Sequence, residues 1–340
     1  MNGNTVRAAW LCAGLASCLS TSAFAQSAPA PTSGEKKEEA FVLPQFVVVE
    51  DRANPYRSQQ AMSSSRVAMD VMDIPQTVSV VTSDFLKDTM SQRMLDAAKY
   101  VTPVAESTLP IGGDRYTIRG FQVSHEFIDG MVISGEDGYS MALAPYNIDR
   151  IEIIKGPNAI LVPGGAPGGQ FNPITKSPLM QDQGTATLEL AQYVGNAVST
   201  DINRVVSKDK GVAARAVLAL WDTGGYQPHY FRKGWMFAPS VSWQISPDHK
   251  FVAKFEIVRN DETTAINLPI DPSVGSDGYA RGARGLPRDF GFANDNDHRE
   301  RETERLTLEL YSNLGKIITS RLQLSGNQVS REDQGGSSAA

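Results

Sequence analysis

The sequence predicts an exported α+β domain followed by antiparallel strands of a transmembrane β-barrel. Three observations predict this architecture. The N-terminus carries an export signal, residues 67–178 mix helical and strand patterns, and only strand-like segments follow Pro178. The α+β pattern predicts a domain with its own core, and the later segments have the length of strands that cross a bilayer at a tilt.

The export signal occupies residues 1–25. Arg7 precedes an apolar stretch at 8–19, and Ala23-Phe24-Ala25 has the small-x-small pattern that signal peptidase reads, so we expect cleavage after Ala25. The apolar stretch is shorter than the roughly 20 residues of a permanent membrane helix. The protein is therefore expected to be exported through a cleaved signal.

Both cysteines, Cys12 and Cys18, lie within this signal, so the mature chain is expected to hold no disulfide. Leu15 to Cys18 also resembles a lipoprotein processing site, which would leave Cys18 acylated at a new N-terminus. The site after Ala25 is better formed, because the apolar core before Cys18 is short.

A flexible leader is predicted at residues 26–66, because its first part is polar and lacks periodicity. It contains one apolar, β-branched island between polar flanks, at residues 41–49. Two interpretations stay open for this island. It is either the first strand of the next domain or a docking strand that adds to the sheet edge of a partner through main-chain hydrogen bonds.

The α+β domain is predicted at residues 67–178. Thr77 to Val81 reads as a strand, Ser83-Asp84 as the cap of a short helix, and residues 91–100 as a second helix with apolar residues on one face. Further strands are predicted at 116–118, 126–128 and 151–154, separated by Gly- and Pro-rich turns.

After residue 178, seven strands of a partial β-barrel are predicted. Apolar residues alternate with polar ones, and the polar face carries Glu189, Arg215, Gln244, Lys254, Glu256 and Glu309. The seven segments are 185–194, 198–206, 212–221, 235–245, 250–258, 304–312 and 316–325.

The connections favour a membrane barrel, whose turns are short on the periplasmic side and long outside. Short turns at 207–211, 246–249 and 313–315 alternate with longer connections at 222–234 and 260–303. Aromatic residues crowd one strand end, as expected of an interfacial girdle: Trp221, Tyr226, Tyr230, Phe231 and Trp235. A soluble β-sandwich alternates equally well, so that alternative stays open on pattern alone.

Several motifs follow one another in residues 74–178. They are Ile74 to Thr82, Tyr116 to Phe121, Ile128 to Met131, Ile148 to Pro157, Gly164 to Gly169, Asn172 and Thr175 to Pro178. In this order they resemble the plug domain of TonB-dependent outer-membrane receptors, and most of all the ferric-siderophore members. The resemblance extends from the segment near Phe41 into the first barrel strands.

This resemblance implies energy-coupled uptake of a ferric siderophore across the outer membrane, with carbohydrate or cobalamin as alternative ligands. It implies docking of the inner-membrane TonB complex on Phe41, Val42, Leu43, Pro44, Gln45, Phe46, Val47, Val48 and Val49. It implies plug motif positions at Arg119, Gly120, Asp129, Gly130, Lys155, Gly156, Pro157, Gly168 and Gly169. Arg119 would pair with carboxylates on the barrel wall, although an ion pair within the plug is equally compatible. Asp129-Gly130 is expected to be a tight turn.

The same residues argue against other classes of function. With a net charge of −6 and no Lys/Arg run beyond two residues, the chain offers no footprint for nucleic acid. The glycines at 164–169 lack the Lys-Ser/Thr of a phosphate-binding loop, and His125-Glu126 lacks the second His of a zinc protease. We therefore expect no enzyme, no cofactor and no metal ligands.

A plugged barrel of this family needs about 22 strands, whereas seven are predicted here. The expectation is therefore a truncated receptor with an incomplete barrel, whose plug folds while the strands after Pro178 are digested by protease. A plug fragment that signals without transporting is the alternative from another class of function.

Overall fold

The computed structural model describes residues 56, 58, 60–61, 69–106, 116–123, 127–133, 141–157, 167–192, 195–225, 228–263, 270–271, 281–282, 287, 289, 297–315 and 318–334. The predicted signal at 1–25 and the docking segment at 41–49 lie outside these residues, as does most of the leader.

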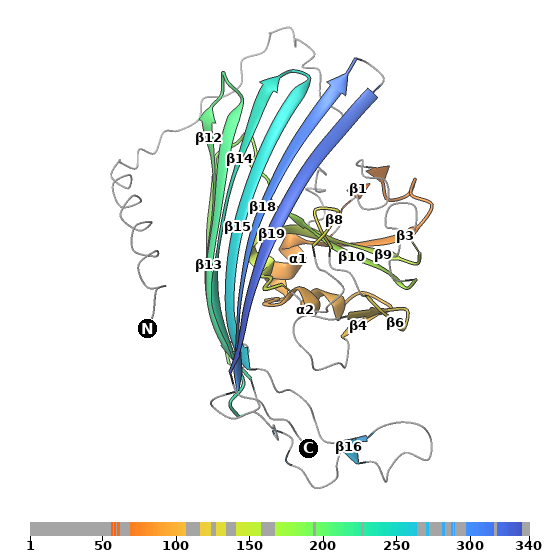
Figure 1. Ribbon diagram of the computed structural model, residues 1–340, viewed down its shortest axis with the longest axis vertical. Helices are drawn as coiled ribbons and strands as arrows, with labels where there is room; N and C mark the ends of the chain where they lie inside the picture. Colours follow the sequence, from red (N-terminus) through yellow and green to blue (C-terminus); the bar gives the residue numbers. More distant parts are fainter. Residues whose placement is uncertain are drawn as a thin grey trace, which may run out of the picture. The chain divides into compact units, whose positions relative to one another are not determined.

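The α+β domain, here called the plug, is built from short elements. In chain order they are β1 (Gln60–Ala61), β2 (Met69–Asp70), β3 (Thr77–Thr82), α1 (Ser83–Asp88), α2 (Met94–Ala98), β4 (Val104–Glu106), β5 (Tyr116–Ile118), β6 (Phe121–Gln122), β7 (Phe127–Ile128), β8 (Met131–Val132), η1 (Pro145–Asn147), β9 (Ile148–Lys155) and β10 (Gly169–Thr175). Its central sheet has the antiparallel order β10-β9-β3 (Figure 1).

The predicted strand at 77–81 and both predicted helices are confirmed, with shifted boundaries. Thr82 caps α1 instead of Ser83-Asp84, because its hydroxyl accepts a hydrogen bond from the Phe85 amide at 3.3 Å. The second helix is only five residues long, and the Asp96 carboxylate accepts from the Arg93 amide at its start.

The plug core is apolar. Ile118, Ile151, Ile153 and Phe171 are each at most 1% exposed, and the Phe171 ring lies 4.3 Å from the ring of Tyr116. Residues from α1, α2, β5, β9 and β10 contribute to this one cluster. The helices therefore fold onto one face of the central sheet through apolar burial.

All seven predicted strands are confirmed and form one antiparallel sheet in chain order (Figure 1). They are β11 (Gln183–Ala191), β12 (Gly195–Ser207), β13 (Val212–Gly224), β14 (Phe231–Ser246), β15 (His249–Thr263), β18 (His298–Leu314) and β19 (Ile318–Gln334). The two-residue strands β16 (Ile270–Asp271) and β17 (Arg281–Gly282) pair with each other between β15 and β18.

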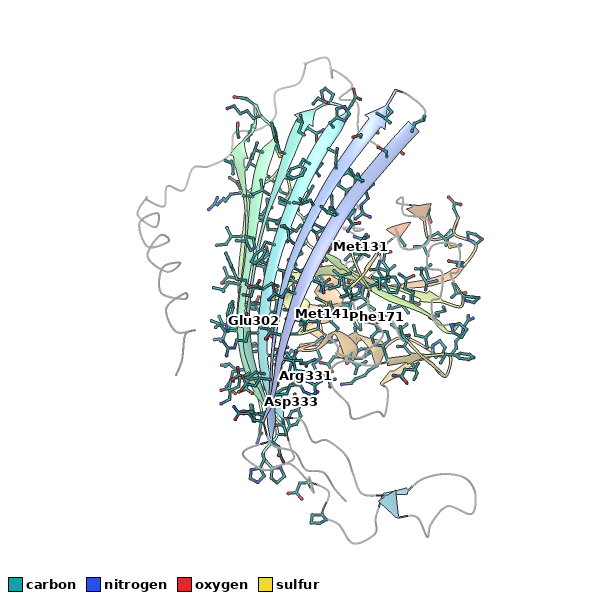
Figure 2. All side chains as sticks on the ribbon, viewed as in Figure 1. Met131, Met141, Phe171, Glu302, Arg331 and Asp333 are labelled. Atoms are coloured by element: carbon teal, nitrogen blue, oxygen red, sulfur yellow. The ribbon has the colours of Figure 1, made fainter. Side chains whose placement is uncertain are left out.

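Six of these strands are longer than predicted, with 13 to 17 residues. The extra residues continue the alternation, but charged side chains such as Glu300 and Glu302 replace the apolar ones. Figure 2 shows Arg331 and Asp333 together toward one end of the sheet.

The two faces of the sheet differ as the alternation predicts. One face, here called the outer face, exposes apolar side chains that include Leu188, Leu218, Leu220, Trp243 and Leu322. The other face, here called the inner face, holds the buried charges of Arg215, Lys254, Glu256, Arg305 and Glu309. An exposed apolar face of this kind is typical of strands in contact with lipid.

The prediction that Trp221 belongs to an interfacial aromatic girdle is wrong. Trp221 is 5% exposed and its ring stacks on Tyr146 of the plug, at 5.7 Å and 22° between planes. Apolar outer-face residues on β13 have even numbers, such as Leu218 and Leu220, so Trp221 belongs to the inner face.

No helix in the described ranges is long and apolar enough to span a bilayer.

A side chain of β12 holds residues 179–181 of the peptide that joins plug and sheet. Asn203 of β12 is fully buried, and its amide oxygen accepts from the Leu179 amide at 2.9 Å. Its Nδ2 donates to the carbonyls of Leu179 and Gln181 at 2.7 and 2.6 Å. Residues 179–181 are therefore held along β12.

Candidate functional site

The tight turn at Asp129-Gly130 lies between the short strands β7 and β8. Both residues have positive φ, 54° and 82°, as a type I′ turn requires. The Asp129 amide donates to the Pro173 carbonyl at 2.9 Å, and the Gly130 amide donates to Asn172 Oδ1 at 3.0 Å. The predicted turn is thus confirmed, and β10 fixes its position.

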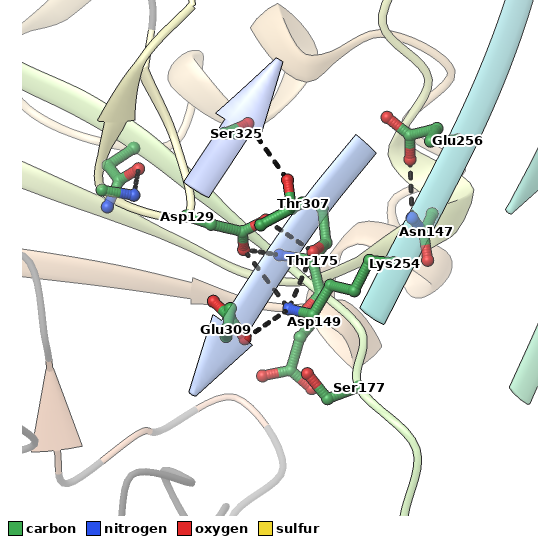
Figure 3. Close-up of polar contacts among 12 residues, drawn as sticks. Asp129, Asn147, Asp149, Thr175, Ser177, Lys254, Glu256, Thr307, Glu309 and Ser325 are labelled. Carbon is green, nitrogen blue, oxygen red and sulfur yellow. Dashed lines mark hydrogen bonds and ion pairs between the residues drawn. The ribbon is translucent and has the colours of Figure 1, made fainter. Parts of the chain in front are cut away.

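The Asp129 carboxylate is 2% exposed and sits among donors from two regions. It accepts from the Thr175 amide at 2.8 Å and from the Thr175 hydroxyl at 2.7 Å, both within the plug. From the sheet, Lys254 Nζ lies 3.8 Å from it (Figure 3). Arg305 Nη1, also from the sheet, reaches it at 3.0 Å. One plug carboxylate is therefore compensated by two sheet cations.

Two further carboxylates of the sheet complete the charge balance. Glu256 pairs with Arg305 at 3.3 Å and accepts from Asn147 Nδ2 of the plug at 2.6 Å. Glu309 lies 3.8 Å from Lys254, pairs with Arg321 at 2.5 Å and accepts from the Tyr311 hydroxyl at 3.0 Å. We call these six charged groups the Asp129 network: Asp129, Lys254, Glu256, Arg305, Glu309 and Arg321.

The network changes the titration of its plug member. Burial by itself raises the pKa of a carboxyl group, but Lys254, Arg305 and the two Thr175 hydrogen bonds outweigh burial and hold the pKa of Asp129 well below its ordinary value. Asp129 is therefore ionised at any physiological pH, and the attraction to the sheet cations persists.

Main-chain groups of the plug also meet the inner face. The Ala142 amide donates to Thr303 Oγ1 at 2.9 Å. Arg232 donates to the carbonyls of Gln92 and Leu143 at 2.7 and 3.1 Å, and Asn327 donates to Ile133 at 3.2 Å. Contacts thus run from β14 to β19.

A second ion cluster lies where the plug meets β12 and β13. Lys176 Nζ donates to the Tyr146 carbonyl at 2.7 Å and to Asp201 at 2.8 Å. Arg215 holds the same carboxylate through two nitrogens at 2.8 Å and donates to the Ser177 carbonyl at 3.0 Å. The C-terminal end of the plug is therefore attached to the sheet by charge-assisted hydrogen bonds.

The other predicted plug positions lie apart from the Asp129 network. Arg119 and Gly120 form an exposed turn with φ of 54° and 81°, and Arg119 has no ion pair with a described residue. Lys155 ends β9, next to Gly156 with φ of 116° and the exposed Pro157. Burial lowers the pKa of Lys155, and the nearby Arg119 lowers it further.

Gly168 and Gly169 allow two backbone segments to approach. A Cβ at Gly168 would lie 2.0 Å from the Ile118 carbonyl oxygen, and one at Gly169 would lie 2.1 Å from that of Ile154. The Gly168 carbonyl accepts from the Gly156 amide at 2.8 Å. These motif glycines therefore serve plug packing in the structure.

Within the described part of the chain, no group of three or more His, Cys, Asp or Glu side chains could hold a metal ion.

The model of the TonB-dependent receptor plug domain matches residues 70–170, inside the predicted 67–178. These residues are a plug domain of the TonB-dependent receptor family. The fold class of the chain, an α+β plug followed by antiparallel strands, is the one predicted, and TonB-dependent receptors are proteins of the outer membrane.

Sequence relatives and solved structures agree with this family. The metal-pseudopaline receptor CntO of Pseudomonas aeruginosa is 31% identical over 205 residues, which are 60% of this chain and 29% of that receptor. The ferripyoverdine receptor of the same species is 23% identical over 64% of this chain and 27% of its own length. The chain thus spans less than a third of either relative. A pyoverdine receptor structure from Pseudomonas aeruginosa has a TM-score of 0.75 at 21% identity, over 84% of this chain and 42% of that chain.

Proposed function

We propose that this chain is the plug-bearing part of a receptor that imports a metal-bound siderophore, or a similar metal chelate, with energy from the TonB complex. The Asp129 network is the observation that carries the proposal. It places a plug carboxylate between sheet cations, where a plug that closes a pore has to be held.

The chemistry of this interface supports a plug that can leave the sheet. Charged and polar groups that separate are solvated by water, whereas an apolar core that opens loses its burial energy. The contacts between plug and inner face include many charged and polar ones, whereas the plug core is apolar. Energy input can therefore loosen the interface without unfolding the plug core.

The names of the relatives indicate the ligand class. One is a receptor for metal-pseudopaline, another for ferripyoverdine, and others include a catecholate siderophore receptor of Escherichia coli. All are receptors, and none is named as an enzyme. A ferric siderophore or a related metal chelate is therefore our proposed ligand, with carbohydrate or cobalamin as the alternative.

Transport by cells that carry the gene tests this proposal. We expect uptake of radiolabelled iron or another metal as its siderophore chelate, induction of the gene under metal starvation, and loss of uptake in a strain without TonB. Induction by a glycan with indifference to metal supply would contradict the ligand class. Ligand-dependent signalling without uptake would support the alternative of a non-transporting plug protein.

The segment Phe41 to Val49 is our proposed docking strand for TonB. Val48→Pro removes one main-chain donor and should abolish uptake while ligand binding stays intact. Val48→Ala keeps that donor and serves as the matched control. Normal uptake by the proline variant would show that TonB docks on another segment.

Arg119 and Lys155 are our proposed additional contact between plug and barrel. Neither has an ion pair with a described residue, and they lie close enough for Arg119 to affect the pKa of Lys155. Two neighbouring cations favour an anionic partner. We propose that carboxylates of the barrel wall meet them. Arg119→Gln should then raise the rate of hydrogen exchange in β5 and β6 of the receptor, and an unchanged rate would contradict the contact.

A further inference from the structure

An aromatic cluster ties the N-terminal leader to the plug. The Tyr56 hydroxyl donates to the Asp88 carboxylate at the end of α1. The Tyr56 ring meets Phe85 edge to face, at 5.8 Å and 88°, and Phe85 meets Tyr100 in the same way, at 5.1 Å and 83°. We call these four residues the Tyr56 clasp.

The clasp lies on the chain between the proposed docking strand and the plug. Tyr56 follows Val49 by seven residues. After it come the buried Ser58 and the two-residue strand β1, which pairs with β2 through Gln60 opposite Asp70. The first strand after β2 that has more than two residues is β3, which begins at Thr77.

The contacts of the clasp are weak enough to open. Tyr56 and Tyr100 are 50% and 60% exposed, so water competes for the hydroxyl and covers part of each ring. An edge-to-face pair and a solvent-exposed hydrogen bond each contribute modestly to stability. The clasp can therefore open locally without unfolding the plug core.

We infer that the Tyr56 clasp is a reversible latch that sets how far the docking strand reaches from the plug. With the clasp closed, the chain from Tyr56 to Val49 spans at most about 24 Å. With the clasp and the β1–β2 pair released, the chain from Thr77 to Val49 spans at most about 95 Å. A partner that binds the leader therefore gains reach when the latch opens.

This inference rests on the proposed function only for the identity of the partner. The latch itself is tested by limited trypsin digestion of the purified chain in detergent. Trypsin cleaves after Arg57, and a protease needs several extended residues around the cut, so cleavage there requires release of Tyr56 and Ser58. Tyr56→Phe should raise the rate about fivefold through loss of the hydroxyl, and Tyr56→Ala should raise it further.

Matched variants separate the latch from a general loosening of α1. Asp88→Ala removes the acceptor of Tyr56, whereas Asp84→Ala removes an exposed carboxylate on the same helix that pairs with Lys87. We expect faster cleavage after Arg57 only in the Asp88 variant. Wild-type rates in Tyr56→Ala, or equal acceleration by Asp84→Ala, would overturn the latch.

A binding measurement then tests its coupling to the partner. The periplasmic domain of TonB should bind Tyr56→Ala about fivefold or more tightly than wild type, because the open latch lets the docking strand extend further from the plug. Faster cleavage with unchanged affinity would overturn the coupling between latch and docking. If both the cleavage and the binding results are as expected but cells that carry the gene take up no metal chelate, the proposed function is contradicted and the latch is not.

Discussion

The core of the plug and the Asp129 network, where the plug meets the sheet, are stabilised by different chemistry. In the core, Phe171, Ile151 and Ile153 exclude water almost completely. In the Asp129 network, Asp129, Lys254 and Arg305 are also buried, at 2%, 8% and 3% exposed, yet they carry charge. Burial of apolar surface is favourable in itself, whereas a buried charge is stable only while its partner stays in place.

This difference teaches which contacts are able to separate and re-form. Apolar residues that leave the core gain no compensation from water, so the core favours one closed state. Charged residues that leave the interface regain their hydration, which offsets much of the lost attraction. The plug can therefore act as a rigid body with an exchangeable surface.

The largest effect is expected in the core. Phe171→Ala should lower the free energy of unfolding of the plug by about 3–5 kcal/mol, because it leaves a cavity beside Tyr116. Urea unfolding of the purified protein, followed by near-ultraviolet circular dichroism, measures this. Phe121→Ala is the control, since Phe121 is 52% exposed. Similar losses in both variants would show that the core is loosely packed.

A somewhat smaller effect, confined to the interface, is expected from Asp129→Asn. Asn tolerates the positive φ of this turn, so the hairpin keeps its shape, but Lys254 and Arg305 lose a buried counter-charge. Breaking a buried pair costs about 3 kcal/mol, so hydrogen exchange at residues 127–133 should speed up roughly 100-fold. Exchange in β9 should not change. Equal acceleration in β9 would erase the distinction between core and interface.

Gly168→Ala tests a close backbone approach within the plug. The added methyl would lie 2.0 Å from the Ile118 carbonyl oxygen, so the backbone has to shift, at a cost of about 1–3 kcal/mol. A lower midpoint of thermal unfolding measures this. Gly326→Ala in β19 is the control, because a methyl there meets no atom within 4 Å. An unchanged midpoint for Gly168→Ala would mean that the loop before β10 adapts freely.

The smallest effect is expected from pH. The folded pKa of Asp129 lies below its ordinary value, so its contribution is complete above about pH 4 and is lost as the pH falls further. Emission of Trp221, which stacks on Tyr146, should stay constant from pH 8 to pH 5 in a chain that lacks residues 1–25, and with them Trp10, and carries Trp235→Phe and Trp243→Phe. A transition within that range that Asp129→Asn abolishes would place the pKa of Asp129 higher than the network implies.

Alternation of apolar residues was sufficient to locate every strand of the sheet, but not their ends. The pattern in β18 predicts residues 304–312, whereas the strand covers His298–Leu314. Glu300, Glu302 and Glu304 continue the period of two without apolar side chains, so hydrophobicity no longer marks it. The inner-face position of Trp221 was readable from its odd number and was obscured by the nearby aromatic residues.

The candidate site was predicted only in part. The Asp129-Gly130 pair identifies a turn because local φ preference selects these residues. Its charge partners, Lys254 and Arg305, are more than 120 residues away and lie on different strands, so no local pattern connects them. Long-range register decides which inner-face cation meets which plug carboxylate.

Asn203 has a consequence for exchanging plugs between receptors. Because one side chain of β12 supplies three hydrogen bonds to Leu179 and Gln181, the joining peptide is matched to that strand and not to the plug alone. In a chimera joined immediately after Thr175, the joining peptide of another receptor would face Asn203 of β12 or its replacement, and the three hydrogen bonds would no longer be matched. A boundary placed beyond β12 would transfer the plug, the joining peptide and Asn203 together.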